Sequence, residues 1–151
     1  MDVSLTFEDN GTIHNDLVLR IGDSAWRGDS YYLAMDQYAG DDDEDAPKVR
    51  KVLRALLEKW KTAIEELTNG ATAYLPYDFS DECTAWLACE LIEGELLIRH
   101  GWADVEGWSI MPSDPPPPTT RPSGFHPNAG PWKISVDDFL KRIARSIEAT
   151  A

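Results

Sequence analysis

The sequence has only two cysteines, no long hydrophobic run and few basic residues, and each scarcity excludes a class of protein. Cys83 and Cys89 lie six positions apart in a segment with the composition of a strand. That spacing corresponds to roughly 20 Å along a strand, whereas a disulfide needs Cα atoms within about 7 Å of each other. We therefore expect two free thiols. No CxxC motif or Cys/His spacing suited to zinc occurs, so we expect no zinc site.

No apolar stretch approaches the ~20 residues that a membrane-spanning helix requires. The first residues, Met1 to Thr6, lack the basic start and the apolar stretch of a signal peptide, so we expect a cytoplasmic protein. Hydrophobic residues nevertheless make up 42% of the chain, and six tryptophans are present, which is unlike a disordered sequence. A chain of 151 residues with this composition predicts a single folded domain, residues 1–151.

Basic residues are scarce and unevenly placed. The chain has 14 lysines and arginines against 27 aspartates and glutamates, a formal net charge of −13. Residues 1–47 carry twelve acids and two bases, residues 68–114 carry nine and one, and residues 48–67 carry six bases. Such a field repels nucleic acid and anionic membranes and attracts basic partners. We therefore expect a basic protein partner and neither nucleic acid nor membrane.

Alternation of apolar and polar side chains marks the expected strands. Asp9-Asn10-Gly11 supplies turn chemistry between the first two strands, and Glu93-Gly94 supplies it between the last two. Residues 22–30 are expected to form a loop between the second and third strands. The pattern predicts six strands, near residues 3–8, 17–21, 31–38, 71–75, 83–92 and 95–100.

Two segments have the periodicity of helices. Residues 46–67 repeat apolar side chains every three or four positions, which predicts an amphipathic helix. We expect it to begin at Asp45 or Ala46 and to end at Asn69-Gly70. A second helix is expected after Ser135-Val-Asp-Asp138, which resembles a capping box with aspartate in place of glutamate.

Proline concentrates in one region, since eight of the ten prolines fall within residues 112–132. This composition predicts an extended arm or long loop, pinned to the body by Phe125 and Trp132. Short turns between successive strands favour antiparallel pairing. We therefore predict an α+β fold, with one largely antiparallel sheet of about five to six strands, two helices packed on one face, and the order βββ-α-βββ-α.

Acidic residues gather in predicted loops, and two tryptophans stand beside acids in residues 102–108. Five adjacent carboxylates at 41–45 cannot be buried together at tolerable cost, so that run is expected to be exposed. Aromatic anchors ringed by charge are typical of protein interfaces. The alternatives are a charged collar at the helix start and aromatic rings that cover the sheet end. The candidate partner-binding residues are Asp41, Asp42, Asp43, Glu44, Asp45, Asp78, Asp81, Glu82, Trp102, Asp104, Glu106 and Trp108.

In size, acidity and α+β pattern the chain resembles the small bacterial immunity proteins that neutralise toxins. The resemblance is one of general style and implies a non-catalytic inhibitor that occludes a basic partner such as a toxin. Its acidic loops would occupy the cationic substrate cleft of a nuclease-like toxin. A domain whose acidity serves only solubility is a further alternative.

A second resemblance points to an enzyme. Residues 18–24, ending in Gly-Asp-Ser, and the segment Gly124-Phe-His-Pro-Asn128 resemble the first and last blocks of SGNH serine ester hydrolases. The resemblance implies Ser24 as nucleophile and His126 as its base. The family's aspartate position holds Ser123 here, which leaves the imidazole without a carboxylate to orient it.

A cation site is a further question, because Asp78, Asp81 and Glu82 fall within five residues. Carboxylates are the ligands of Ca²⁺ and Mg²⁺, but the segment lacks the glycine and the ligand periodicity of an EF-hand loop. We therefore expect neither a metal nor a cofactor.

Overall fold

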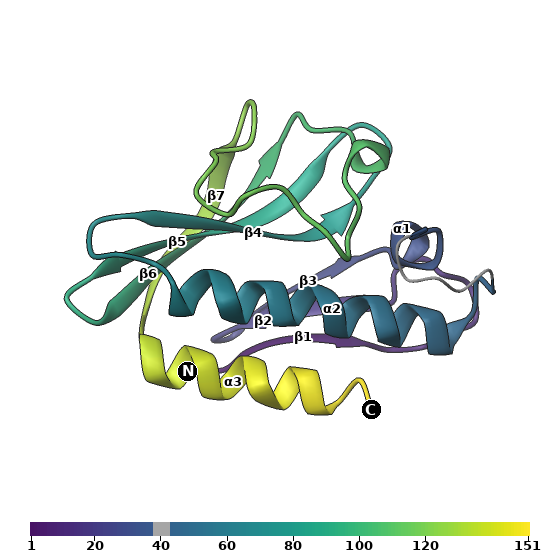
Figure 1. The fold of residues 1–151 in the computed structure, drawn as a ribbon, viewed down its shortest axis with the longest axis horizontal. Coiled ribbons are helices and arrows are strands. Elements are labelled where there is room, and N and C mark those ends of the chain that lie inside the picture. The colour runs from purple at the N-terminus through teal and green to yellow at the C-terminus, as the bar shows by residue number, and fades with distance from the viewer. Residues whose placement is uncertain (38–42) are drawn as a thin grey trace.

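The computed structural model describes residues 1–37 and 43–151. Over these residues the fold is α+β, with a three-stranded and a four-stranded antiparallel sheet and three α-helices (Figure 1). The strands are β1 (Val3–Phe7), β2 (Leu17–Ile21), β3 (Ser24–Gly28), β4 (Thr72–Phe79), β5 (Thr84–Ile92), β6 (Glu95–Ala103) and β7 (His126–Ser135). The helices are α1 (Tyr31–Ala34), α2 (Ala46–Glu65), α3 (Val136–Glu148) and the 3₁₀ turn η1 (Gly107–Ser109).

The first sheet has the order β1-β2-β3. The predicted hairpin of the first two strands is confirmed, with Leu5 opposite Leu19. The predicted third strand over 31–38 is wrong, because the chain turns back at once at Gly22, which has φ +57°, and forms β3 instead. Of the expected strand, Tyr31–Ala34 forms α1, and position 38 lies outside the described residues.

The second sheet has the order β4-β5-β6-β7. The predicted turn at Glu93-Gly94 is confirmed, with φ values of +50° and +81° as in a two-residue hairpin turn. The predicted arm over 112–132 is wrong at its end, because β7 begins at His126. Pro127 is tolerated there because β7 is an edge strand and its register with β6 shifts around His100.

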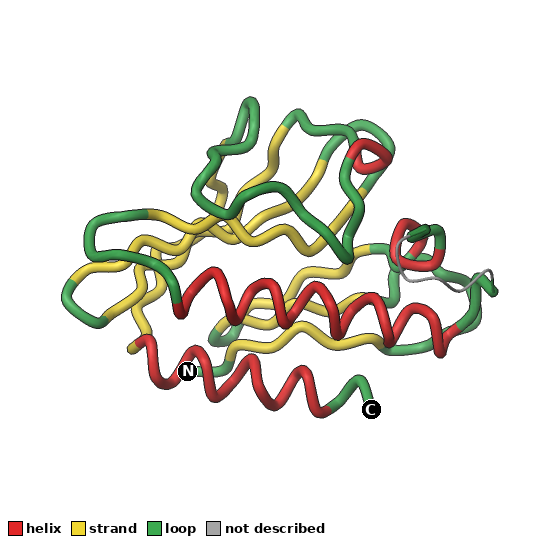
Figure 2. Tube along the Cα trace, in the orientation of Figure 1, coloured by secondary structure: helices red, strands yellow, loops and turns green. Residues whose placement is uncertain are grey.

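The expectation of one sheet with two helices is therefore also wrong. Figures 1 and 2 show α2 and α3 lying alongside the first sheet, while the second sheet crosses above it. The predicted apolar stripe of α2 is confirmed as core. Asp45 is the N-cap of α2 and accepts a hydrogen bond from the Lys48 amide at 3.2 Å, and Ser135 caps α3 in the same way through Asp138. The buried residues of α2 include Val49, Val52, Leu53, Leu56, Leu57, Trp60 and Ile64.

A buried aromatic and polar cluster joins the two sheets. Trp26 of β3 stacks on His100 of β6, with ring centroids 4.2 Å apart. The imidazole is fully buried, and its Nδ1 donates to Asn128 Oδ1 at 2.6 Å while its Nε2 accepts from the Tyr77 hydroxyl at 2.5 Å. Burial lowers the pKa of His100, so the ring is neutral near pH 7. Both hydrogen bonds lie within the second sheet and hold the imidazole ring in place, and Trp26 of β3 packs on the face of this ring.

The proline-rich segment covers the free edge of β4. The Tyr74 amide donates to the Pro118 carbonyl at 2.7 Å, and Trp60 Nε1 of α2 donates to the Pro76 carbonyl at 2.9 Å. An exposed strand edge would invite pairing with other chains, and proline and a covering loop prevent it. Phe125 is buried and Trp132 is partly buried against the core, as expected for the residues that hold this segment.

Candidate functional site

Two acidic loops lie side by side at one end of the second sheet. The β4–β5 turn carries Asp81 and Glu82, and the segment after β6 carries Asp104 and Glu106, all four exposed. We call these four carboxylates the acidic end. The Gly107 amide donates to the Ser80 carbonyl at 2.7 Å and ties the loops together. The contact needs glycine, because a Cβ at this position would lie 2.3 Å from the Ser80 oxygen.

Trp108 is the exposed aromatic residue of this end. Its side chain is 64% exposed, next to Glu106 and beside the acidic β4–β5 turn. Trp102 is different, because it packs against the core with its ring centroid 6.3 Å from that of His100. The structure therefore divides the two predicted tryptophans into a packing residue and a surface residue that a partner can contact.

Asp78 lies inside the protein, although it was predicted together with Asp81 and Glu82. It is 5% exposed, and its Oδ1 accepts a hydrogen bond from the Asp29 amide at 3.2 Å. Burial raises the pKa of Asp78 to about 6, and the bond from the Asp29 amide partly opposes this shift. β3 can approach Asp78 this closely because Gly28 has no side chain. A Cβ at this position would lie 2.6 Å from the Asp78 carboxyl carbon. Asp78 is thus buried at the junction of the two sheets, where it bonds the residue that follows β3.

Cys83 sits among these carboxylates. Burial raises the pKa of its thiol, and the negative charges of Asp78, Glu82 and Asp104 raise it further. The thiolate is the nucleophilic form of cysteine, so this environment makes Cys83 a poor nucleophile. The expectation of two free thiols is confirmed, since Cys83 and Cys89 form no disulfide.

The acidic run before α2 is described only from Asp43 onward, and Asp41 and Asp42 lie outside the described residues. Asp43, Glu44 and Asp45 are exposed. Figure 1 shows that α2 begins beside α1, at the same end of the molecule as the β4–β5 turn and η1. The exposed carboxylates at 43–45 and the four of the acidic end therefore lie at the same end of the protein.

A cavity of about 400 Å³ opens between α1 and the β4–β5 turn. Asp29 lies 3.5 Å from His14 Nδ1 in an ion-pair geometry, and the Tyr32 hydroxyl donates a hydrogen bond to Asp81. That hydrogen bond raises the pKa of Tyr32 to about 12. This cavity was not predicted from the sequence, because Tyr31 and Tyr32 were expected in a strand and His14 has no motif around it. It is lined by His14, Asp29, Tyr31, Tyr32, Phe79, Ser80 and Asp81.

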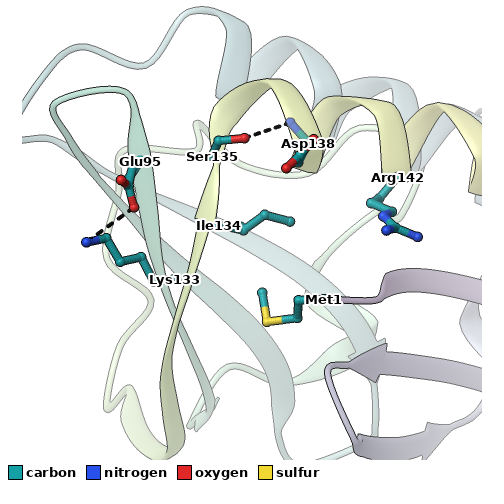
Figure 3. Close-up of a pocket in the computed structure, with 7 residues that line it drawn as sticks. All are labelled: Met1, Glu95, Lys133, Ile134, Ser135, Asp138 and Arg142. Atoms are coloured by element: carbon teal, nitrogen blue, oxygen red, sulfur yellow. Dashed lines mark hydrogen bonds and ion pairs between the residues drawn. The ribbon is translucent and has the colours of Figure 1, made fainter.

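A second hollow, of about 450 Å³, lies at the start of α3 (Figure 3). Lys133 pairs with Glu95 at 3.4 Å, and Ser135 accepts a hydrogen bond from the Asp138 amide at 3.1 Å. Arg142 of α3 also lines it. The charges here are of mixed sign, and the ion pair and the cap give structural roles to three of these side chains, those of Lys133, Glu95 and Ser135.

The two residues of the predicted hydrolase are not brought into a catalytic pair. Ser24 pairs with Ile21 at the start of β3, whereas His126 pairs with Trp102 at the start of β7 in the other sheet. Within residues 1–37 and 43–151 no hydrogen bond joins Ser24 to His126. A serine nucleophile needs its base within hydrogen-bond reach, so this geometry does not supply one.

Among the described residues, no three His, Cys, Asp or Glu side chains are grouped so that they could hold a metal ion. None of the described helices has the length and apolar character needed to cross a membrane. Comparisons with protein-family models, with curated proteins and with solved structures find no match for this chain.

Proposed function

We propose that this protein is a non-catalytic binding protein whose acidic end engages a basic protein partner. The observation that carries the proposal is the exposed Trp108 beside the carboxylates of Asp81, Glu82, Asp104 and Glu106. A partly solvated tryptophan supplies a large apolar contact area, and the surrounding carboxylates supply orientation and steering.

The charge of the whole chain supports fast association with a basic surface. A net charge of −13 on 151 residues creates an attractive field that accelerates encounter with a cationic partner. Such a field weakens with added salt, because the Debye length falls to about 8 Å at physiological ionic strength. Association with the partner is therefore expected to slow as salt is raised.

The partner class that fits best is a toxin that acts on a polyanion in the bacterial cytoplasm. A nuclease-like enzyme binds phosphates with lysines and arginines, and a carboxylate surface of matching shape competes for the same cations. In this role the protein is an immunity protein that inhibits its toxin by occlusion. The mechanism needs no catalytic residue in the inhibitor.

Affinity capture with matched variants tests this proposal. The tagged protein is incubated with native lysate at low and raised salt, and retained proteins are identified by mass spectrometry. The test variant combines Asp81→Asn, Glu82→Gln and Glu106→Gln. The control variant combines Glu93→Gln, Asp137→Asn and Glu148→Gln, three exposed acids in other parts of the fold.

Wild type and control are expected to retain one basic protein in stoichiometric amount, and raised salt and the test variant are each expected to reduce its yield. Equal retention by the test and control variants would contradict the proposal, because both lose the same charge. Retention of no partner by the wild type at either salt concentration would also contradict it.

A further inference from the structure

The cavity between α1 and the β4–β5 turn combines aromatic walls with two carboxylates. The rings of Tyr31 and Tyr32 are 5.0 Å apart in an edge-to-face arrangement, and His14 stacks on Tyr31 at 5.8 Å. Phe79, which is almost fully buried, also lines the cavity. Aromatic faces carry negative charge density and attract cations placed over them.

The carboxylates that line this cavity are held in place by neighbouring groups. Asp29 Oδ1 accepts a hydrogen bond from the Asn15 amide at 2.7 Å, and its Oδ2 faces His14. Asp81 Oδ1 accepts a hydrogen bond from the Tyr32 hydroxyl, while its Oδ2 has no partner among the described residues. Both groups are therefore oriented before any ligand arrives, which reduces the entropy lost on binding.

The charge of the cavity is negative, since no lysine or arginine is among the residues that line it. Its volume of about 400 Å³ falls in the usual range for small-ligand sites, roughly 300–1,000 Å³. An apolar ligand would cover Asp81 Oδ2 without offering it a hydrogen bond, and an anion would be repelled by both carboxylates. A cation with a flat face fits the aromatic walls and the carboxylates together.

We propose that this cavity receives the guanidinium group of an arginine side chain presented by the basic partner. The inference rests on the proposed function and identifies one point of contact within it. Arginine suits the site better than lysine, because its planar group stacks on tyrosine and histidine rings and offers five donors to two carboxylates. Trp108 and this cavity then form two separate anchors at the same end of the molecule.

A titration with small probes tests the inference without the partner. N-acetyl-arginine amide is added to isotopically labelled protein at low salt, and backbone amide shifts are followed by NMR. Saturable shifts are expected in residues 13–16, 29–33 and 79–82. N-acetyl-citrulline amide has nearly the same shape without the charge, and is expected to bind at least about tenfold more weakly. N-acetyl-lysine amide is expected to bind more weakly than the arginine probe.

Two variants and a control locate the site. Asp81→Asn and Asp29→Asn keep the shape of the side chain, and each is expected to weaken the arginine probe at least about fivefold. Glu93→Gln removes the same charge at the opposite end of the second sheet and is expected to leave the probe affinity unchanged. Unchanged amide spectra away from the site show that each variant is folded.

Several results would overturn the inference. They are equal binding of the citrulline probe, equal binding of the lysine probe, shifts centred elsewhere, or no effect of both aspartate variants. These outcomes leave the partner capture untouched, so they are distinct from a failure of the proposed function. If the probe binds as expected but capture does not depend on the acidic end, the cavity is a guanidinium site, while its role as a contact for the partner falls with the proposed function.

Discussion

Replacing Asp78 by asparagine should stabilise the protein at neutral and higher pH. Asp78 is 5% exposed, and its one hydrogen bond from a described residue comes from the Asp29 amide. Asparagine has nearly the same shape, and its side-chain carbonyl can accept this bond. The variant therefore removes a buried charge without removing a contact or opening a cavity at Gly28.

The size and sign of the effect follow from the pKa. Burial raises the pKa of Asp78 from 3.8 to about 6 in the folded protein. Since one pKa unit corresponds to about 1.4 kcal/mol, ionising this group in the folded state costs about 3 kcal/mol at most. The folded pKa lies above the unfolded one, so the contribution to stability is complete below pH 4 and is lost as the pH rises through 6. Above pH 7 the Asp78→Asn variant avoids this cost.

Urea unfolding followed by tryptophan fluorescence, at several pH values from 4 to 8, measures this effect. The difference in unfolding free energy between variant and wild type cancels the other titrating groups. We expect it to be near zero at pH 4 and to reach about 1–3 kcal/mol in favour of the variant at pH 8. A variant that is less stable than the wild type at pH 8, or a difference that does not change with pH, would refute the reasoning.

Three further predictions concern the junction of the sheets, the loop contact and the hydrolase alternative. Tyr77→Phe leaves His100 Nε2 buried without a donor and should lower the unfolding free energy by about 1–3 kcal/mol in urea, and an unchanged midpoint would contradict it. Gly107→Ala places a methyl group 2.3 Å from the Ser80 oxygen and should cost at least about 1 kcal/mol by thermal unfolding, whereas a neutral effect would show that the loop yields freely. Ser24→Ala should leave the rate of p-nitrophenyl acetate hydrolysis at the level of wild type, and a loss of wild-type turnover would favour the hydrolase.

Local patterns predicted those elements whose causes are local. The stripe of α2, its start at Asp45 or Ala46 and the turn at Glu93-Gly94 were all predicted, because periodicity, capping and turn chemistry act within a few residues. The position of β3 could not be predicted in this way. Its short segment has weak alternation, and the contact that holds it, Trp26 on His100, joins residues far apart in the chain.

The same limit applies to the candidate site, because local patterns indicate only some of its residues. Asp81 and Glu82 were expected between two strands, and both are exposed in the turn between β4 and β5. Burial of Asp78 depends on the close approach of Gly28, which no local pattern indicates. The cavity draws His14, the tyrosines of α1 and Asp81 from three separate segments, so only the fold brings them together.

The salt dependence of association with the captured partner tests the central claim most directly. The association rate constant is measured by stopped-flow fluorescence from about 20 to 500 mM salt for wild type and for the Asp81→Asn, Glu82→Gln, Glu106→Gln variant. We predict a rate that falls steeply with salt in the wild type and less steeply in the variant. Equal salt dependence in the two proteins, or a rate independent of salt, would contradict binding through the acidic end.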